Sequence, residues 1–295
     1  MIQEIVIASG KGGTGKTFIS SNLSYFLLKN GFNILSVDAD VEAPDLLLAL
    51  GGVKKKIFHE DFYGNIVDID YSKCIGCGLC EDVCRFNAIS IKNGLPRIDY
   101  NSCEGFGACM LVCPVKAMSM KKIRRGNIFI AISNENIPIV TGDLDVGERN
   151  SGLLVYRLRN IARKYALEKG LNIVVIDAAP GIGCPVVSSI VGANLLIIVI
   201  EPTSQSLKGA KRLLNLSKKL GLNIVSIINK YDLNQTFSKK IEKNDELNVI
   251  GKIGYDENVV KAYSLMIPFL KLYPEDSVSK NLIKVFYKIL SEVKS

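Results

Sequence analysis

The chain has 295 residues, of which 48% are hydrophobic, and a formal net charge of +8. A chain of this length and composition can bury a sizeable core. Its longest dense apolar run, Leu195 to Ile200, is far too short to cross a bilayer, which excludes a membrane-spanning protein. The positive charge would attract any anionic ligand, so it does not by itself indicate nucleic acid. We expect a cytoplasmic protein with no nucleic-acid partner and no membrane association.

Runs that favour strands and helices alternate along the chain. Strands are predicted at residues 2–8, 32–37, 128–132, 137–140, 173–176, 195–200, 224–228 and 249–253. Helices are predicted at residues 17–29, 151–168 and 206–220, with two more after the last strand. The basic run Lys54 to Lys56 is interpreted as a solvated linker, and the single histidine on it, His59, as incidental. Repeated strand-then-helix units predict an α/β fold in which helices cover both faces of a mostly parallel sheet.

A glycine-rich loop follows the first predicted strand and opens a helix. Its residues are Gly10, Lys11, Gly12, Gly13, Thr14, Gly15, Lys16 and Thr17. In this context the backbone N–H groups and the helix N-terminus converge on phosphate oxygens. We expect Lys16 to reach the β and γ phosphates of a nucleoside triphosphate, and the Thr17 hydroxyl to bind Mg²⁺. The loop therefore predicts a P-loop NTPase.

The cysteines follow a duplicated spacing. The run Cys74, Cys77, Cys80 and Cys84, moved by 29 positions, gives Cys103, Phe106, Cys109 and Cys113. Seven of the eight cysteines belong to this repeat, so disulfides do not explain them, and zinc does not explain the duplication. Thiolate ligands and a nucleotide site both favour a reducing cytoplasm.

This repeat resembles the bacterial two-cluster ferredoxin module, in which the fourth cysteine of each run ligates the other cluster. The resemblance implies an inserted small α+β ferredoxin-like iron-sulfur domain at residues 63–122, with the P-loop ATPase domain formed by residues 1–62 and 123–295. It assigns a [4Fe-4S] cluster to a first cysteine set, Cys74, Cys77, Cys80 and Cys113. It leaves a second cysteine set incomplete, namely Cys84, Cys103 and Cys109. Three thiolates suit a [3Fe-4S] cluster, a [4Fe-4S] cluster with one other ligand, or an empty site.

The extra lysine in the phosphate loop, Lys11, indicates which family of P-loop NTPases the chain resembles. The pattern Gly-Lys-Gly-Gly-x-Gly-Lys-Thr resembles the deviant loop of the MinD/ParA ATPases, a group that includes the nitrogenase iron protein and the Mrp-type cluster carriers. The resemblance implies an ATP-dependent homodimer in which Lys11 reaches the partner's phosphates. It also implies that Asp40 positions the attacking water, that Asp38 assists the metal shell, and that Asp177 holds Mg²⁺. Lys11, Lys16 and Asp40 are thus the expected catalytic residues.

The residues expected to contact the base of the nucleotide do not decide between ATP and GTP. The resemblance places Asn229 at the base and favours ATP. Asn229-Lys230-Tyr231-Asp232 also matches Asn-Lys-x-Asp, in which the aspartate binds guanine in GTPases, so GTP remains an alternative. Cys184, seven residues after Asp177, lacks a second free cysteine to share a cluster and is interpreted as a small buried residue.

Together these motifs predict an ATP hydrolase that couples ATP binding and hydrolysis to electron transfer toward a redox or client metalloprotein. The insertion begins shortly after Asp40, so a segment that responds to the γ phosphate could reorient it. Two alternatives remain: a carrier that delivers clusters during metalloenzyme maturation, and a MinD-like positioning protein that uses clusters as redox sensors.

Overall fold

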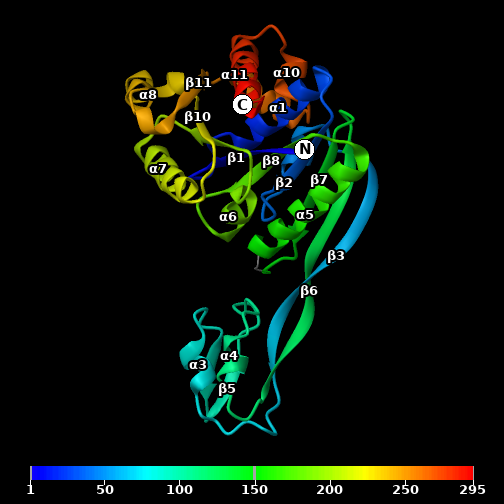
Figure 1. The fold of residues 1–295 in the computed structure, drawn as a ribbon, viewed down its shortest axis with the longest axis vertical. Helices are drawn as coiled ribbons and strands as arrows, with labels where there is room; N and C mark the ends of the chain where they lie inside the picture. The colour runs from blue at the N-terminus through cyan, green and yellow to red at the C-terminus, as the bar shows by residue number, and fades with distance from the viewer. Residues whose placement is uncertain (1, 149–150, 295) are drawn as a thin grey trace. The chain divides into compact units, whose positions relative to one another are not determined.

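The computed structural model describes residues 2–148 and 151–294, and these form two compact units. The first unit contains residues 2–59, 128–143 and 151–294, and the second contains residues 60–127 and 144–148. Two long strands, β3 (Val53–Ile69) and β6 (Met118–Ser133), contribute residues to both units (Figure 1). The second unit is therefore inserted into the first through a pair of strands.

A nine-stranded sheet in the order β11-β10-β9-β1-β8-β2-β7-β6-β3 forms the core of the first unit. The strands from β11 to β7 pair in parallel. They are β1 (Gln3–Ser9), β2 (Ile34–Ala39), β7 (Pro138–Leu144), β8 (Ile173–Pro180), β9 (Leu195–Ile200), β10 (Ile224–Asn229) and β11 (Val249–Ile253). The central strands are apolar on both sides, as parallel strands between two helix layers must be.

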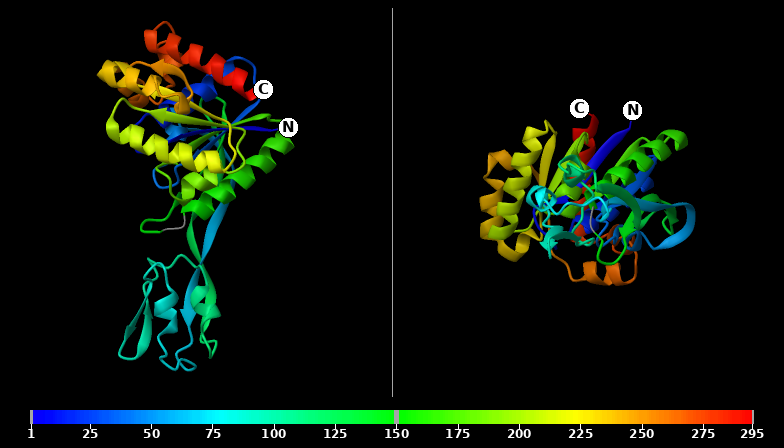
Figure 2. Two further views of the ribbon diagram at one scale, coloured as in Figure 1. Left: turned by 60° about the vertical axis from the view of Figure 1, so that its left-hand side comes forward. Right: turned by 90° about the horizontal axis from the view of Figure 1, so that it is seen from below.

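Helices cover both faces of this sheet (Figures 1 and 2). One layer contains α1 (Lys16–Lys29), α10 (Phe269–Leu272) and α11 (Ser277–Lys294), and their apolar side chains pack on one set of alternate strand residues, such as Ile5 and Ile7. The other layer contains α5 (Ser151–Lys169), α6 (Cys184–Ile190) and α7 (Ser204–Lys219). The predicted α/β fold with a mostly parallel sheet is confirmed.

The remaining elements of the first unit are short. They are α2 (Leu46–Ala49), the 3₁₀ turns Tyr231–Asn234 and Asp245–Leu247, α8 (Gln235–Glu242) and α9 (Asn258–Ser264). Three helices follow β11 in the described residues, where the sequence predicted two. Met266 adopts φ of 54° and Pro268 precedes α10, and these two residues divide what would otherwise be one helix.

The predicted linker at Lys54 to Lys56 is wrong, because these lysines lie in β3. β3 is the edge strand of the sheet, so its side chains need no buried partners and its charges discourage pairing with another chain. Lys54 donates a hydrogen bond to the Asn136 side chain, and Lys56 lies over the ring of Phe129. His59 belongs to the same exposed strand.

The second unit is built from two halves with the same local geometry. The backbone N–H of Asp70 donates to the carbonyl of Ala117, and that of Asp99 donates to the carbonyl of Ala88, both across 2.8 Å. Each half has one short helix, α3 (Leu79–Val83) or α4 (Ala108–Leu111). β4 (Ile89–Lys92) and β5 (Leu95–Ile98) form a hairpin that turns at Asn93-Gly94. Both turn residues have positive φ, a conformation that Asn and Gly adopt readily. The sequence offset of 29 is thus repeated in the backbone.

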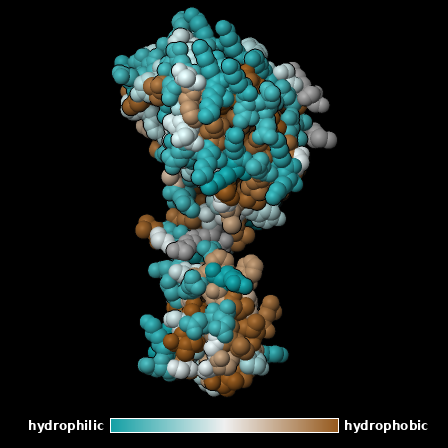
Figure 3. All heavy atoms as spheres, turned by 90° about the vertical axis from the view of Figure 1, so that its left-hand side faces the viewer, coloured by the Kyte–Doolittle hydropathy of each residue, from teal (hydrophilic) through white to brown (hydrophobic). Residues whose placement is uncertain are grey.

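The surface of the second unit is rich in hydrophobic side chains on the face that Figure 3 shows. Its exposed large hydrophobic residues, among those that the structure describes, are Tyr63, Tyr71, Ile75, Leu79, Phe86, Leu95, Tyr100, Phe106, Leu111, Val112 and Val146. Among the described residues, none of the helices combines the length and the apolar character needed to span a bilayer.

Candidate nucleotide and cluster sites

The phosphate loop connects β1 to α1, as its sequence predicted. Gly13 and Gly15 adopt φ of 77° and 93°, the left-handed region that side chains avoid. A Cβ atom at Gly10 would lie 2.0 Å from the backbone of Gly209 on α7, and one at Gly15 would lie 2.3 Å from the Nδ2 atom of Asn229. Glycine is therefore needed at both positions to bring the loop against its neighbours.

Polar side chains at the carboxyl ends of β2 and β8 lie where the sequence predicts Mg²⁺ to bind. Asp38 and Asp177 are register neighbours on these parallel strands, and both are buried. The Thr17 hydroxyl donates to Asp177 across 2.6 Å, and the Ser20 hydroxyl donates to the same carboxylate across 3.0 Å. Hydroxyl and carboxylate oxygens are ligands that Mg²⁺ accepts, directly or through water, so this donor set fits the ion.

The carboxyl groups at this edge of the sheet have raised pKa values. Burial raises the pKa of Asp38 well above its usual range, and the neighbouring Asp177 adds to the shift. Burial also raises the pKa of Asp177 and of the half-buried Asp40, while the charge of Lys16 opposes both shifts. Three acidic groups thus lie close together and two of them, Asp40 and Asp177, interact with the buried Lys16, so a divalent cation would relieve their mutual repulsion.

Asp38 also organises the segment that carries Asp40. Its carboxylate accepts hydrogen bonds from the backbone N–H groups of Asp40 and Leu46, across 3.2 and 2.8 Å. Asp38 is therefore a support for the Asp40 loop as well as a neighbour of Asp177. Asp40 interacts electrostatically with Lys16 of the phosphate loop, and its role in positioning water stays a prediction.

Lys11 is bound within its own chain. Its Nζ atom lies 2.8 Å from Glu201 Oε2, and the Nζ atom of Lys230 lies 2.8 Å from Glu201 Oε1. Lys230 Nζ also donates to the carbonyl of Gly13 across 3.0 Å. Burial would raise the pKa of Glu201, but the hydrogen bonds from Lys11 and Lys230 outweigh it and lower the pKa.

Asn229 is the last residue of β10, and Asp232 lies in the 3₁₀ turn Tyr231–Asn234 that follows it. Asn229 donates from Nδ2 to the carbonyl of Thr14 across 2.8 Å, so it braces the phosphate loop. Asp232 is exposed, and one of its carboxylate oxygens accepts the backbone N–H of Tyr255 across 2.8 Å. Of these two, only Asn229 contacts the phosphate loop directly.

Sequence reasoning missed two polar residues of this site, Ser20 and Glu201. Ser20 lies one helical turn after Lys16, a spacing that places it on the same face of α1. Glu201 directly follows the buried strand β9, which neighbours β1 in the sheet. Glu201 could have been found from the sequence, because it is a charged residue at the carboxyl end of a strand that neighbours β1, the strand that leads into the phosphate loop.

The first cysteine set lines one small cavity of the second unit. Cys74, Cys77, Cys80 and Cys113 all contribute to its wall, and its volume is about 20 Å³. The Cys113 sulfur accepts a hydrogen bond from the backbone N–H of Ala117 across 3.2 Å. Four thiols around one space, with an N–H group aimed at a sulfur, are a donor set that fits a [4Fe-4S] cluster.

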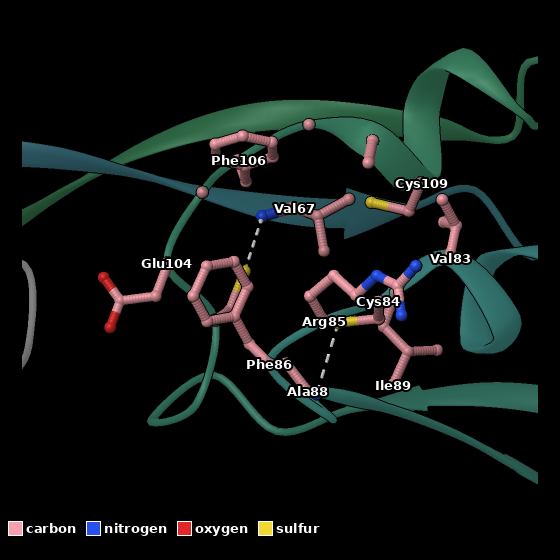
Figure 4. Close-up of a pocket in the computed structure, with 14 residues that line it drawn as sticks. Val67, Val83, Cys84, Arg85, Phe86, Ala88, Ile89, Glu104, Phe106 and Cys109 are labelled. Atoms are coloured by element: carbon pink, nitrogen blue, oxygen red, sulfur yellow. Dashed lines mark hydrogen bonds between the residues drawn. The ribbon is translucent and has the colours of Figure 1, made fainter.

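The second cysteine set lines a separate and larger cavity of about 290 Å³ (Figure 4). Backbone N–H groups donate to two of its sulfurs, from Ala88 to Cys84 across 3.3 Å and from Val67 to Cys103 across 3.5 Å. Burial raises the pKa of Cys109, and its neighbour Cys103 adds to the shift.

The open side of this cavity is aromatic. Phe106, at the position of the missing fourth cysteine, is 81% exposed, and its ring centroid lies 6.2 Å from that of Phe86. The Glu104 carboxylate points away from the cavity, while the sulfurs of Cys84 and Cys109 face it (Figure 4). The protein thus supplies three thiols to this cavity.

Within residues 2–148 and 151–294, no three His, Cys, Asp or Glu side chains converge closely enough to hold a single metal ion. In an iron-sulfur cluster each thiolate binds a different iron atom, so the sulfurs surround a larger body than one ion. Cys184, expected to be buried, is instead exposed at the start of α6, where the preceding residues Ile182 and Gly183 are exposed as well.

Residues 5–269 match the family model of the CobQ/CobB/MinD/ParA nucleotide binding domain. An uncharacterised protein of Methanocaldococcus jannaschii is 35% identical over 99% of this chain and 98% of its own length. A protein of Saccharolobus solfataricus named as an iron-sulfur cluster carrier protein is 23% identical over 99% of this chain and 84% of that protein.

The fold is also similar to solved structures. The septum site-determining protein MinD of Pyrococcus horikoshii, complexed with Mg-ADP, superposes with a TM-score of 0.62 at 21% identity, over 100% of this chain and 99% of that one. The cell division ATPase MinD of Pyrococcus furiosus gives a TM-score of 0.60 at 19% identity, over 99% of each chain.

Proposed function

Because this chain belongs to the family of CobQ/CobB/MinD/ParA nucleotide binding domains, we propose that it couples ATP binding and hydrolysis to electron transfer toward a partner protein. The chain is a P-loop ATPase of the MinD/ParA type. The observation that carries the proposal is that the two cysteine sets line two separate cavities, each with at least one N–H group aimed at a sulfur, in the same chain as the phosphate loop.

At the nucleotide site, positioning and charge neutralisation do most of the work. The backbone N–H groups of the loop and the ammonium of Lys16 neutralise the phosphates. Thr17 and Asp177 would hold Mg²⁺, which when bound neutralises charge on the β and γ phosphates. Asp40 orients the attacking water, and Lys11 acts on the phosphates of the partner in an ATP-dependent homodimer.

In the second unit, the first cysteine set would hold a [4Fe-4S] cluster, and the second set a [3Fe-4S] cluster or a [4Fe-4S] cluster with one other ligand. When bound, such clusters accept and donate single electrons. The backbone N–H groups of Ala88, Val67 and Ala117 stabilise negative charge on the sulfurs, so these residues tune the potential. Reduced thiols suit a cytoplasmic location, and the partner would be a redox or client metalloprotein.

The proposal is tested on anaerobically purified protein. Iron, acid-labile sulfide and zinc are measured, and the paramagnetic signal is recorded after strong reduction. We expect iron, sulfide and a reduced [4Fe-4S] signal that is lost in Cys77→Ser. The exposed Cys184→Ser is the matched control and keeps the signal. Zinc in place of iron and sulfide would refute the cluster assignment.

Coupling is measured with Asp40→Ala, which should retain an ATP-bound dimer because the phosphate contacts survive while water is no longer positioned. We expect the reduction rate or the midpoint potential to differ between this form and the ADP form. A coupling of about 1 to 3 kcal/mol corresponds to tens of millivolts or more for a one-electron couple. Identical values in all nucleotide states, with a candidate partner present, would refute the coupling.

A second function, delivery of clusters to other proteins, is favoured by the relatives that are named iron-sulfur cluster carriers. The two functions differ in how firmly the cluster is held. A carrier releases its cluster to an apo-protein within minutes, in a manner that depends on ATP. An electron-transfer protein keeps its cluster through repeated reduction and oxidation in the presence of the same acceptor.

A further inference from the structure

We propose that Glu201 is a latch that holds Lys11 in its own subunit until ATP-bound subunits meet, an inference that rests on the proposed role of Lys11 in the homodimer. The latch consists of Glu201 with Lys11 on one carboxylate oxygen and Lys230 on the other, each at 2.8 Å. A lysine in this position is not available to a partner's phosphates. Dimer formation must therefore break the bond between Lys11 and Glu201.

The surroundings of Glu201 keep the latch in place. The Glu201 side chain is only 13% exposed, against 26% for Lys11 and 27% for Lys230. The backbone N–H of Glu201 donates to the Ser206 hydroxyl across 2.9 Å, which fixes the carboxylate at the end of β9. The Lys11 backbone is fixed as well, because its carbonyl accepts the Ser9 hydroxyl across 2.6 Å. Both ends of the ion pair are thus anchored by short local contacts.

The second lysine allows the latch to open without leaving a buried charge unpaired. When Lys11 leaves, Glu201 still binds Lys230, which also donates to the Gly13 carbonyl of the phosphate loop. An orphaned, largely buried carboxylate would be costly, and Lys230 prevents it. When the dimer forms, Lys11 therefore exchanges a carboxylate of its own chain for a phosphate bound to the other subunit. The phosphate carries more negative charge than the carboxylate.

The latch predicts that removing the Glu201 charge promotes dimerisation. A partly exposed ion pair is worth up to about fivefold in an equilibrium constant. Two latches open for each dimer, so Glu201→Gln should tighten the dimer formed with a non-hydrolysable ATP analogue by up to about 25-fold. Analytical ultracentrifugation measures this constant, and Glu275→Gln, which removes an exposed acidic charge, is the matched control.

Chemical modification tests the latch in the monomer, independently of dimerisation. Acetic anhydride must reach the amine nitrogen, so a lysine whose ammonium is held against a carboxylate reacts slowly. In nucleotide-free monomer we expect Lys11 to be acetylated severalfold faster in Glu201→Gln than in wild type or Glu275→Gln, as quantified by mass spectrometry. Glu201→Asp, whose shorter side chain cannot reach both lysines, should give the same result if the glutamine variant unfolds.

The outcomes separate the latch from the function on which it rests. Equal acetylation of Lys11 in wild type and in both Glu201 variants would overturn the latch, and so would an unchanged or weaker dimer. A dimer that survives Lys11→Ala would instead refute the role of Lys11 across the interface, while the acetylation result would still decide whether Glu201 holds Lys11 in the monomer.

Discussion

The guanidinium of Arg125 donates a hydrogen bond from Nη2 to the carbonyl oxygen of Cys103 across 2.7 Å. Arg125 is completely buried, and its Nη1 atom pairs with Glu148. Its side chain fills the space beside Gly64, where a Cβ atom would lie 2.5 Å from it. A buried positive charge is thus tied to the backbone of a residue from the second cysteine set.

Arg125→Met should destabilise the second unit, because Glu148 and the Cys103 carbonyl lose their partner. Leaving the Cys103 carbonyl and the partly exposed Glu148 carboxylate without this partner should cost about 1 to 3 kcal/mol, which denaturant unfolding of the apo-protein would detect. If a cluster occupies the second set, its reduction potential should fall by on the order of 50 mV, because the lost charge favoured the reduced form. The exposed neighbour Arg124→Gln is the control, and equal stability of the two variants would contradict this account.

Phe106→Cys should supply a fourth thiolate to the second cysteine set. The side chain is 81% exposed at the mouth of the cavity, so the change removes little packing. We expect the iron content to rise toward that of two [4Fe-4S] clusters, with a second four-iron paramagnetic signal after reduction. Phe86→Cys, at the same cavity but off the ferredoxin spacing, is the control. No gain in iron over that control would mean that this cavity does not hold a cluster.

Asp177→Asn should abolish Mg²⁺-dependent ATP hydrolysis while stabilising the nucleotide-free protein. The amide loses the charge needed for the metal, but it also ends the repulsion from Asp177 that adds to the effect of burial in raising the pKa of Asp38. Thermal unfolding without nucleotide and a phosphate-release assay measure the two effects. Asp245→Asn, at an exposed position, should change neither. A destabilised nucleotide-free variant would show that repulsion between the two carboxylates is not the dominant effect.

Glu4 should make the stability of the first unit dependent on acid pH. Burial alone would raise its pKa, but pairing with Arg163 and Arg159 on α5 lowers it below the ordinary value of 4.5. The stabilisation is therefore fully present above about pH 4.5 and is lost as the pH falls through the lower folded pKa. Denaturant titrations of wild type and Glu4→Gln between neutral and acid pH measure it.

The glutamine variant should be less stable by about 3 kcal/mol at neutral pH, since it leaves buried Arg159 without its carboxylate. The difference from wild type should shrink in acid. Glu246→Gln, at an exposed position, serves as the control. A difference that stays constant with pH would contradict the ion-pair explanation.

ATP should bind at least about tenfold more tightly than GTP, a difference of about 1.4 kcal/mol. The contacts of Asn229 and Lys230 with the phosphate loop hold the loop whichever base is bound, and one oxygen of Asp232 is already used by Tyr255. Calorimetric titration with each nucleotide measures the ratio. Tighter GTP binding would mean that Asp232 accepts hydrogen bonds from a guanine ring.

The sequence by itself determined the local chemistry of this protein. The seven strands from β11 to β7, the helices α1, α5 and α7, the phosphate loop and the repeat of 29 residues could be predicted, because periodicity, glycine spacing and ligand spacing are properties of neighbouring residues. The short helices α6 and α8 were missed. The strands Leu195–Ile200 and Val249–Ile253 have the predicted bounds, since turns or breaks flank both runs. The edge strand β3 was missed because its first residues, 53–59, are exposed on both sides and show no alternation of apolar and polar residues.

Only the tertiary structure decided which distant side chains meet. Glu201 joins Lys11 and Lys230 because β9, β1 and β10 are near neighbours in the sheet although they are far apart in the sequence. Arg125 reaches Cys103 for a similar reason, through packing within the second unit. Such pairs depend on the order of the strands in the sheet and on which residues are buried. A single sequence determines both only through the sum of many weak long-range contacts.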